Sequence, residues 1–161
     1  ESRIGALERQ ERPVPVVAIY HTGAGQSIPS GGATNTIVNY DTLVVDTHSA
    51  VTTGASWQFV APLAGSYLVT ARVTFAAATA WAEHNIARLR VAVNGTLSAV
   101  LGQEEGRDFA AAATLLSVGG TAIVLLAAGD ELDVQALQVS GGSLNLHTNV
   151  MFNHVGIFRI H

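Results

Sequence analysis

The sequence contains no cysteine and no lysine, and charged residues make up only 12% of it, about half of the usual quarter. Without cysteine the chain has neither disulfides nor thiolate metal sites, so packing and hydrogen bonds must hold the fold together. Eight arginines stand against twelve acidic residues, which gives a net charge of −4. Because no basic run exists, we expect no binding to nucleic acid through phosphate neutralisation.

Hydrophobic residues, in contrast, make up 48% of the chain, and the mean hydropathy is positive. A domain of 161 residues is large enough for a real core, yet this one has few polar groups to cover its surface. Either the domain is simply rich in alanine, or it buries apolar surface against copies of itself. We favour the second interpretation, because large exposed apolar patches usually mark interfaces. No apolar run reaches the roughly 18 residues that a membrane helix needs, so we expect no membrane span.

The first thirteen residues, ESRIGALERQERP, differ from the rest of the chain. They hold six of its charged residues, and Pro13 ends a segment that is otherwise compatible with a helix. Ile4 and Leu7 are three positions apart, which is weak evidence for a coiled coil. We therefore interpret residues 1–13 as an N-terminal arm, either a frayed terminus or the end of a stalk that docks through Ile4 and Leu7, and residues 14–161 as one domain.

From Val14 onward, short segments rich in β-branched residues alternate with glycine-rich loops. In SYLVTARVTFA, apolar residues occupy one face and polar residues the other, with Leu68 as the exception, which is typical of a half-buried strand. RVAVNGT repeats this alternation and ends in an Asn-Gly turn signal. TAIVLLAAGDELDVQALQV predicts two strands joined at a Gly-Asp turn. Eight or so such strands predict a β-sandwich or jelly roll.

One turn gives a more specific signal. The segment FVAPLAGSYLV resembles the F-x-A-P-x-x-G-x-Y signature of the complement C1q-like domain, a relative of the tumour necrosis factor fold. RVAVNGT, LLAAGDEL and FNHVGIFRI resemble later segments of that family in the same order, although the last has two extra residues between its phenylalanine and its glycine. The residues that carry the resemblance are Phe59, Pro62, Gly65, Tyr67, Gly129, Asp130, Phe152 and Gly156. The resemblance covers residues 14–161.

The turn also makes physical sense without the resemblance. Pro62 lacks an N–H and suits the end of a strand, and Gly65 can adopt a backbone angle that other residues resist. Phe59 and Tyr67 then lie on adjacent strands on either side of the turn, where we expect them to pack on each other and on the core rather than to contact a ligand.

The resemblance implies an all-β, antiparallel jelly-roll sandwich of about ten strands. It also implies a compact homotrimer, often on a stalk, and binding rather than catalysis. A closed three-fold ring would bury part of the apolar surface. His154 and Phe158, in the closing strand, are then the candidate residues at the trimer axis.

Candidate ligands and catalytic groups form no recognisable pattern. None of the six histidines has metal-type spacing, so we interpret them as scattered polar residues; the alternative is that His154 or His161 stacks with its symmetry mates as a pH-sensitive or metal site. Some members of the family bind calcium, and oxygen ligands for it would come from the loop acids, but no dense acidic loop exists and we expect no cofactor. Those acids are Asp41, Asp46, Asp130, Glu131 and Asp133. Nucleophile-elbow, phosphate-loop and paired-carboxylate motifs are absent, so we expect no catalytic residues and no enzyme.

Two functional hypotheses remain. The first is a non-enzymatic trimeric structural or attachment protein on the surface of a virus particle, from a bacteriophage: a fibre knob or a capsid decoration protein. Its arm would dock onto other virion proteins, and its partner would be a host receptor or glycan. The alternative is a secreted or surface-bound bacterial adhesion module that binds glycans or proteins.

Overall fold

A computed structural model of the protein describes residues 14–33, 35–78, 81–82, 84–106 and 114–160. These residues form strands and one short 3-10 helix, and none of them is α-helical, which confirms the all-β prediction. The elements are β1 (Val17–His21), β2 (Ser27–Ile28), β3 (Thr36–Ile37), β4 (Thr42–Asp46), β5 (Val51–Thr52), β6 (Gln58–Val60), β7 (Gly65–Ala78), β8 (Ile86–Val93), β9 (Thr96–Glu105), β10 (Thr114–Leu126), β11 (Glu131–Val139), β12 (Leu144–Asn145), η1 (Val150–Phe152) and β13 (His154–Arg159). Within this part of the chain no helix is long and apolar enough to cross a membrane.

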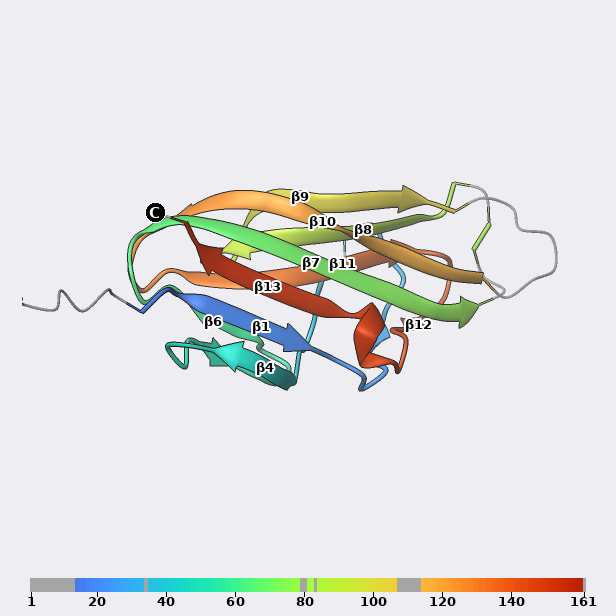
Figure 1. The fold of residues 1–161 in the computed structure, drawn as a ribbon. Coiled ribbons are helices and arrows are strands. Elements are labelled where there is room, and N and C mark those ends of the chain that lie inside the picture. Colours follow the sequence, from blue (N-terminus) through green and yellow to red (C-terminus); the bar gives the residue numbers. More distant parts are fainter. Residues whose placement is uncertain (1–13, 34, 79–80, 83, 107–113, 161) are drawn as a thin grey trace, which may run out of the picture.

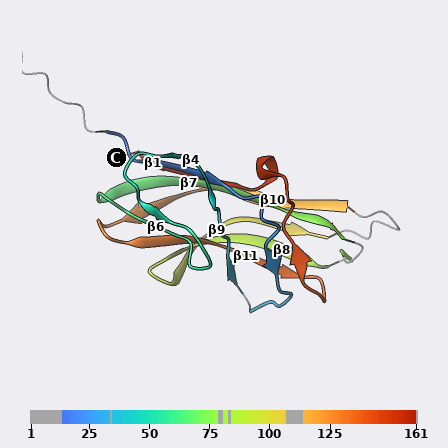
Figure 2. The same cartoon turned by 90° about the horizontal axis from the view of Figure 1, so that it is seen from below.

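The strands form two antiparallel sheets that pack face to face (Figures 1 and 2). The first sheet has the order β10-β7-β13-β1-β4, and the second has the order β5-β6-β11-β8-β9, with β3 beside β11. In the first sheet, neighbours come from distant parts of the sequence, since β13 lies between β1 and β7. The ten strands of the two main ladders confirm the predicted antiparallel jelly-roll sandwich, and β2, β3 and β12 are short additions to it.

The core lies between the sheets and is built from the alternation seen in the sequence. Tyr67, Val69, Val73 and Phe75 of β7 are fully buried, as predicted. Thr74, on the polar face of the same strand, is also fully buried. Its polar groups have partners there, because the Thr74 amide donates to Asn153 Oδ1 and the Thr74 hydroxyl is hydrogen-bonded to the Ser117 hydroxyl.

The turn in FVAPLAGSYLV is not a hairpin. Phe59 lies in β6 of the second sheet and Tyr67 in β7 of the first, so the prediction that they occupy adjacent strands is wrong. The chain crosses here from one sheet to the other, because the ladder partners of β6 are β5 and β11. The predicted contact nevertheless forms, since the two buried rings meet edge to face with centroids 5.6 Å apart, and the Tyr67 hydroxyl donates to the carbonyl of Leu63.

The same turn is hydrogen-bonded to the Gly-Asp turn between β10 and β11. The Ala61 amide donates to the Asp130 carbonyl at 2.9 Å, and the Gly129 amide donates to the Ala61 carbonyl at 2.8 Å. Gly129 has a φ of +89°, which favours glycine. The two sequence signals that carried the resemblance are therefore one structural unit at one end of the sandwich.

One side of the sandwich closes where β9 and β10, from different sheets, run beside each other (Figure 1). Glycines make this approach possible. A Cβ atom on Gly120 would lie 2.0 Å from the carbonyl oxygen of Leu101, and one on Gly102 would lie 2.5 Å from that of Gly119. The backbones of β9 and β10 therefore occupy the space that a Cβ atom at Gly102 or Gly120 would need.

The closing strand begins later than its sequence motif suggests. Phe152 lies in η1, outside β13, so its grouping with the last strand is wrong. The two extra residues are Asn153 and His154; Asn153 caps η1 and His154 opens the strand. The predicted arm, with Ile4 and Leu7, and the terminal His161 lie outside the described residues.

Candidate functional site

The candidate site is the side of the first sheet that faces away from the core, which we call the open face. Strand register places four apolar side chains there in one row across four strands. The row consists of Ile123 on β10, Leu68 on β7, Phe158 on β13 and Val17 on β1. Ile123 is 65% exposed, and the other three are half-buried. Exposed Leu125, two residues along the edge strand β10 from Ile123, extends the apolar surface.

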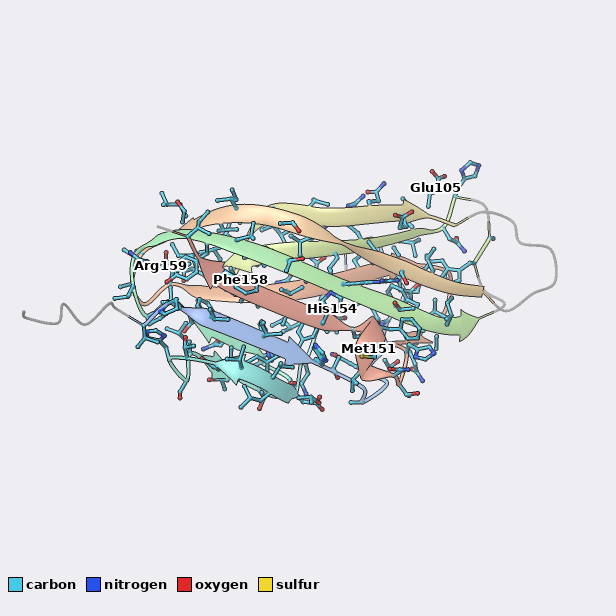
Figure 3. All side chains as sticks on the ribbon, viewed as in Figure 1. Glu105, Met151, His154, Phe158 and Arg159 are labelled. Carbon is cyan, nitrogen blue, oxygen red and sulfur yellow. The ribbon has the colours of Figure 1, made fainter. Side chains whose placement is uncertain are left out.

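Phe158 lies across its own strand. A Cβ atom built on Gly156 would meet the Phe158 ring at 2.9 Å and the Thr70 methyl group at 3.2 Å. The ring therefore covers the space that the missing side chain leaves. His154 and Phe158, predicted as axis residues, both lie on the open face of β13 (Figure 3).

A second row, four residues along each strand from the apolar row, is cationic. Arg72 on β7 pairs with His154 on β13, and His154 pairs with His21 on β1. The two imidazole rings have centroids 6.1 Å apart. Burial, His21 and the Arg72 guanidinium together lower the pKa of His154 below its ordinary value, because each disfavours its charged form. We call these three residues the cationic row.

Asn153 fixes the position of the cationic row from beneath. Its side chain is fully buried, accepts from the Thr74 amide at 2.8 Å and donates to the carbonyls of Thr22 and His147 at 3.2 and 2.7 Å. It thus ties the end of β1 and the loop before η1 to β7. A buried amide that satisfies three backbone groups is costly to remove, so Asn153 is a positioning residue for its neighbour His154.

The outer face of the second sheet has a different character. Arg88 Nε donates to Gln103 Oε1 at 2.7 Å, and Arg90 Nη1 donates to Asn35 Oδ1 at 3.2 Å. Burial, then the Arg88 charge, lower the pKa of Arg90. Both guanidinium groups therefore have partners within the protomer.

The acids considered for calcium are not gathered into one site. Asp46 accepts from the Tyr20 hydroxyl and from three backbone amides of the following loop. Burial and this hydrogen bond raise the pKa of Tyr20 to about 12. Asp130 accepts from Asn94 and Ala127 instead. In the described part of the chain no three His, Asp or Glu side chains lie close enough together to hold a metal ion.

The described histidines lie apart from one another, except for one pair that sequence reasoning missed. His48 contacts Thr47, His84 contacts Glu105 at 2.8 Å, and His147 packs on Phe152. His21 and His154 are far apart in the sequence, and only the pairing of β1 with β13 brings them together. The two histidines stand in the first and last strands of the domain, but the sequence does not show that these two strands pair.

Comparison with solved structures places the fold among known proteins. No family model and no curated protein matches the sequence. Solved structures match closely in shape: Eiger TNF from S. frugiperda has a TM-score of 0.64 at 14% identity, covering 91% of this chain and 93% of that one. The globular domain of zebrafish complement 1qA has a TM-score of 0.64 at 14% identity, with coverage of 92% and 98%. Murine APRIL has a TM-score of 0.61 at 12% identity, covering 91% of this chain and 100% of that one.

These similarities define a class. The protein has the jelly-roll fold of the TNF and C1q globular domains, as the turn signature suggested. At such low identity the likeness establishes the fold, and a fold does not by itself establish a function.

Proposed function

We propose that this protein is a non-enzymatic homotrimeric module that assembles through the open face of its first sheet. The observation that supports the proposal is the apolar row, which spans four strands and continues to exposed Leu125. Exposed apolar surface of this kind marks interfaces, and the fold resembles that of domains that assemble as trimers. A closed ring leaves no apolar patch free for further growth.

Light scattering after size-exclusion chromatography tests the assembly. We expect a mass three times that of the 16.7 kDa chain. Ile123→Glu places a charge in the apolar row at a position that is 65% exposed, so the protomer should fold and the trimer should fall apart. Thr52→Glu adds the same charge at an exposed position of the second sheet and should leave the trimer intact. A monomeric wild-type protein would remove the proposal.

We further propose that the trimer is a structural or attachment protein of a bacteriophage particle, at a fibre tip or on the capsid. A jelly roll without cysteine or lysine, rich in alanine and glycine and preceded by a short charged segment, supports this assignment. Cryo-microscopy of the source particle tests it, since a surface without such trimers would contradict it. A secretion signal encoded upstream of Glu1 would favour the adhesion module instead.

A further inference from the structure

The cationic row is unlike the rest of the molecule in its charge. The chain has a net charge of −4, yet three basic side chains lie together on the open face. Arg72 is exposed, and His21 and His154 are half-buried. Arg72 donates from Nη2 to Ser117 Oγ at 3.0 Å. In the described residues no acidic side chain pairs with any of these three groups.

A hollow of about 440 Å³ lies beside this row, lined among others by Arg72, His154, Ser117, Gly119 and Glu104. Gly119 is opposite Arg72 on β10, so no side chain fills the space next to the guanidinium. The Ser117 hydroxyl is held in place between Arg72 and the Thr74 hydroxyl, 2.7 Å away. A guanidinium, an imidazole and a hydroxyl group therefore border one open space on a rigid sheet.

We propose that the cationic row, with the hollow beside it, is a binding site for a small tetrahedral oxyanion such as phosphate or sulfate. Guanidinium groups match the geometry of such anions, and hydrogen bonds between charged partners are stronger than neutral ones. A metal ion is the wrong ligand, because the fixed charge of Arg72 beside His154 repels a cation.

The groups around the row set the pH dependence of binding. Glu104 lies at the rim, on β9, and opposes an anion. Asp41 precedes Thr42, which lies opposite His21 in the ladder between β1 and β4. The Asp41 carboxylate accepts a hydrogen bond from the Thr42 hydroxyl at 3.2 Å. β10 contributes only Ser117, Gly119 and Thr121 on this side, and η1 (VMF) has no titratable side chain. Protonation of His154, whose pKa lies below its ordinary value, adds positive charge to the site, so binding should tighten as the pH falls through that pKa.

Imidazole NMR signals of the full-length protein test the site. Sodium phosphate and sodium sulfate are titrated separately at pH 6, against sodium chloride at equal ionic strength. We expect saturable shifts of the His21 and His154 signals, none at His84, and a pKa of His154 that rises by about one unit. Affinity should be about tenfold weaker at pH 8. Shifts that chloride reproduces, or affinity that does not change with pH, would overturn the site.

Three variants sharpen this test. Arg72→Gln should weaken oxyanion binding about tenfold, because it removes a charged hydrogen-bond donor. Glu104→Gln should strengthen binding, because it removes the opposing charge at the rim. Arg88→Gln, on the other sheet, should change nothing; unchanged binding in Arg72→Gln would contradict the site. The row lies on the open face through which the proposed trimer would assemble, but one protomer supplies all of its groups. Oxyanion binding by the monomeric Ile123→Glu variant therefore tests the site, and the mass in solution tests the trimer.

Discussion

The two outer surfaces of the sandwich differ although similar strands form them. On the second sheet, Arg88 and Arg90 each donate to an amide oxygen of the same protomer, from Gln103 and Asn35 respectively. On the open face of the first sheet, Arg72 likewise donates to Ser117, but an apolar row crosses four strands of the same face. The two surfaces therefore differ in pattern: guanidinium–amide pairs mark the second sheet, and the apolar row marks the first.

The comparison teaches that the residues of one strand do not determine the character of the surface to which that strand contributes. The outward residues of β7 include Arg72 and two threonines, and those of β8 include Arg88 and Arg90. Both strands look equally polar from outside. The difference arises from the neighbours, because β7 lies between β10 and β13 whereas β8 lies between β11 and β9.

The largest effect is expected in the interior that the two sheets share. Tyr67→Ala should lower the free energy of unfolding by about 3 kcal/mol, because a fully buried ring leaves a cavity against Phe59. Tyr67→Phe keeps the ring and should cost about 1 kcal/mol, the value of its hydrogen bond to Leu63. Chemical denaturation measures both, and equal losses in the two variants would contradict the packing described here.

The next effect concerns the edge that joins the two surfaces. Gly120→Ala should cost about 2 to 3 kcal/mol, because its Cβ would overlap the Leu101 carbonyl and force β9 and β10 apart. Gly142→Ala is the matched control, since nothing lies within 4 Å of a Cβ there. Thermal melts compare the two, and similar melting temperatures would mean that the closed edge tolerates separation.

The support beneath the cationic row gives a direct contrast between the surfaces. Asn153→Ala should cost about 2 kcal/mol, because it leaves buried backbone groups of Thr74, Thr22 and His147 without their partner. Gln103→Ala, on the exposed face of the second sheet, should change the free energy of unfolding by less than about 0.5 kcal/mol. If the two losses proved equal in urea denaturation, Asn153 would not be the anchor of the open face.

The smallest effect is a pH-dependent one at the turns of the second sheet. Hydrogen bonds from Asn94 and Ala127 hold the pKa of Asp130 below its ordinary value. Its ionised form therefore stabilises the fold above the unfolded-state pKa, and this contribution is lost as the pH falls through the lowered pKa. Asp130→Asn should melt slightly earlier than wild type at pH 7 and equally at pH 2. A difference that persists in acid would rule out this charge as the cause.

Much of the fold could be predicted from local signals. Alternation in β7 and β8, and the turns at Asn94 and Gly129, were read correctly because they depend on neighbouring residues in the chain. The prediction that Phe59 and Tyr67 lie on adjacent strands is wrong, because sequence distance does not distinguish a turn within one sheet from a crossover between sheets. Phe152 was placed in the last strand for a similar reason, since the motif does not show that Asn153 caps a helix there.

The sequence by itself determined the all-β class, the aromatic contact at the signature turn and the shortage of charge that points to assembly. These follow from composition and from residues close together in the chain. Tertiary structure alone decided that His21, Arg72 and His154 form one row and that Ile123, Leu68 and Phe158 belong to another. Such rows depend on which strands pair and in what register, and pairing between distant strands is set by the packing of the whole sandwich.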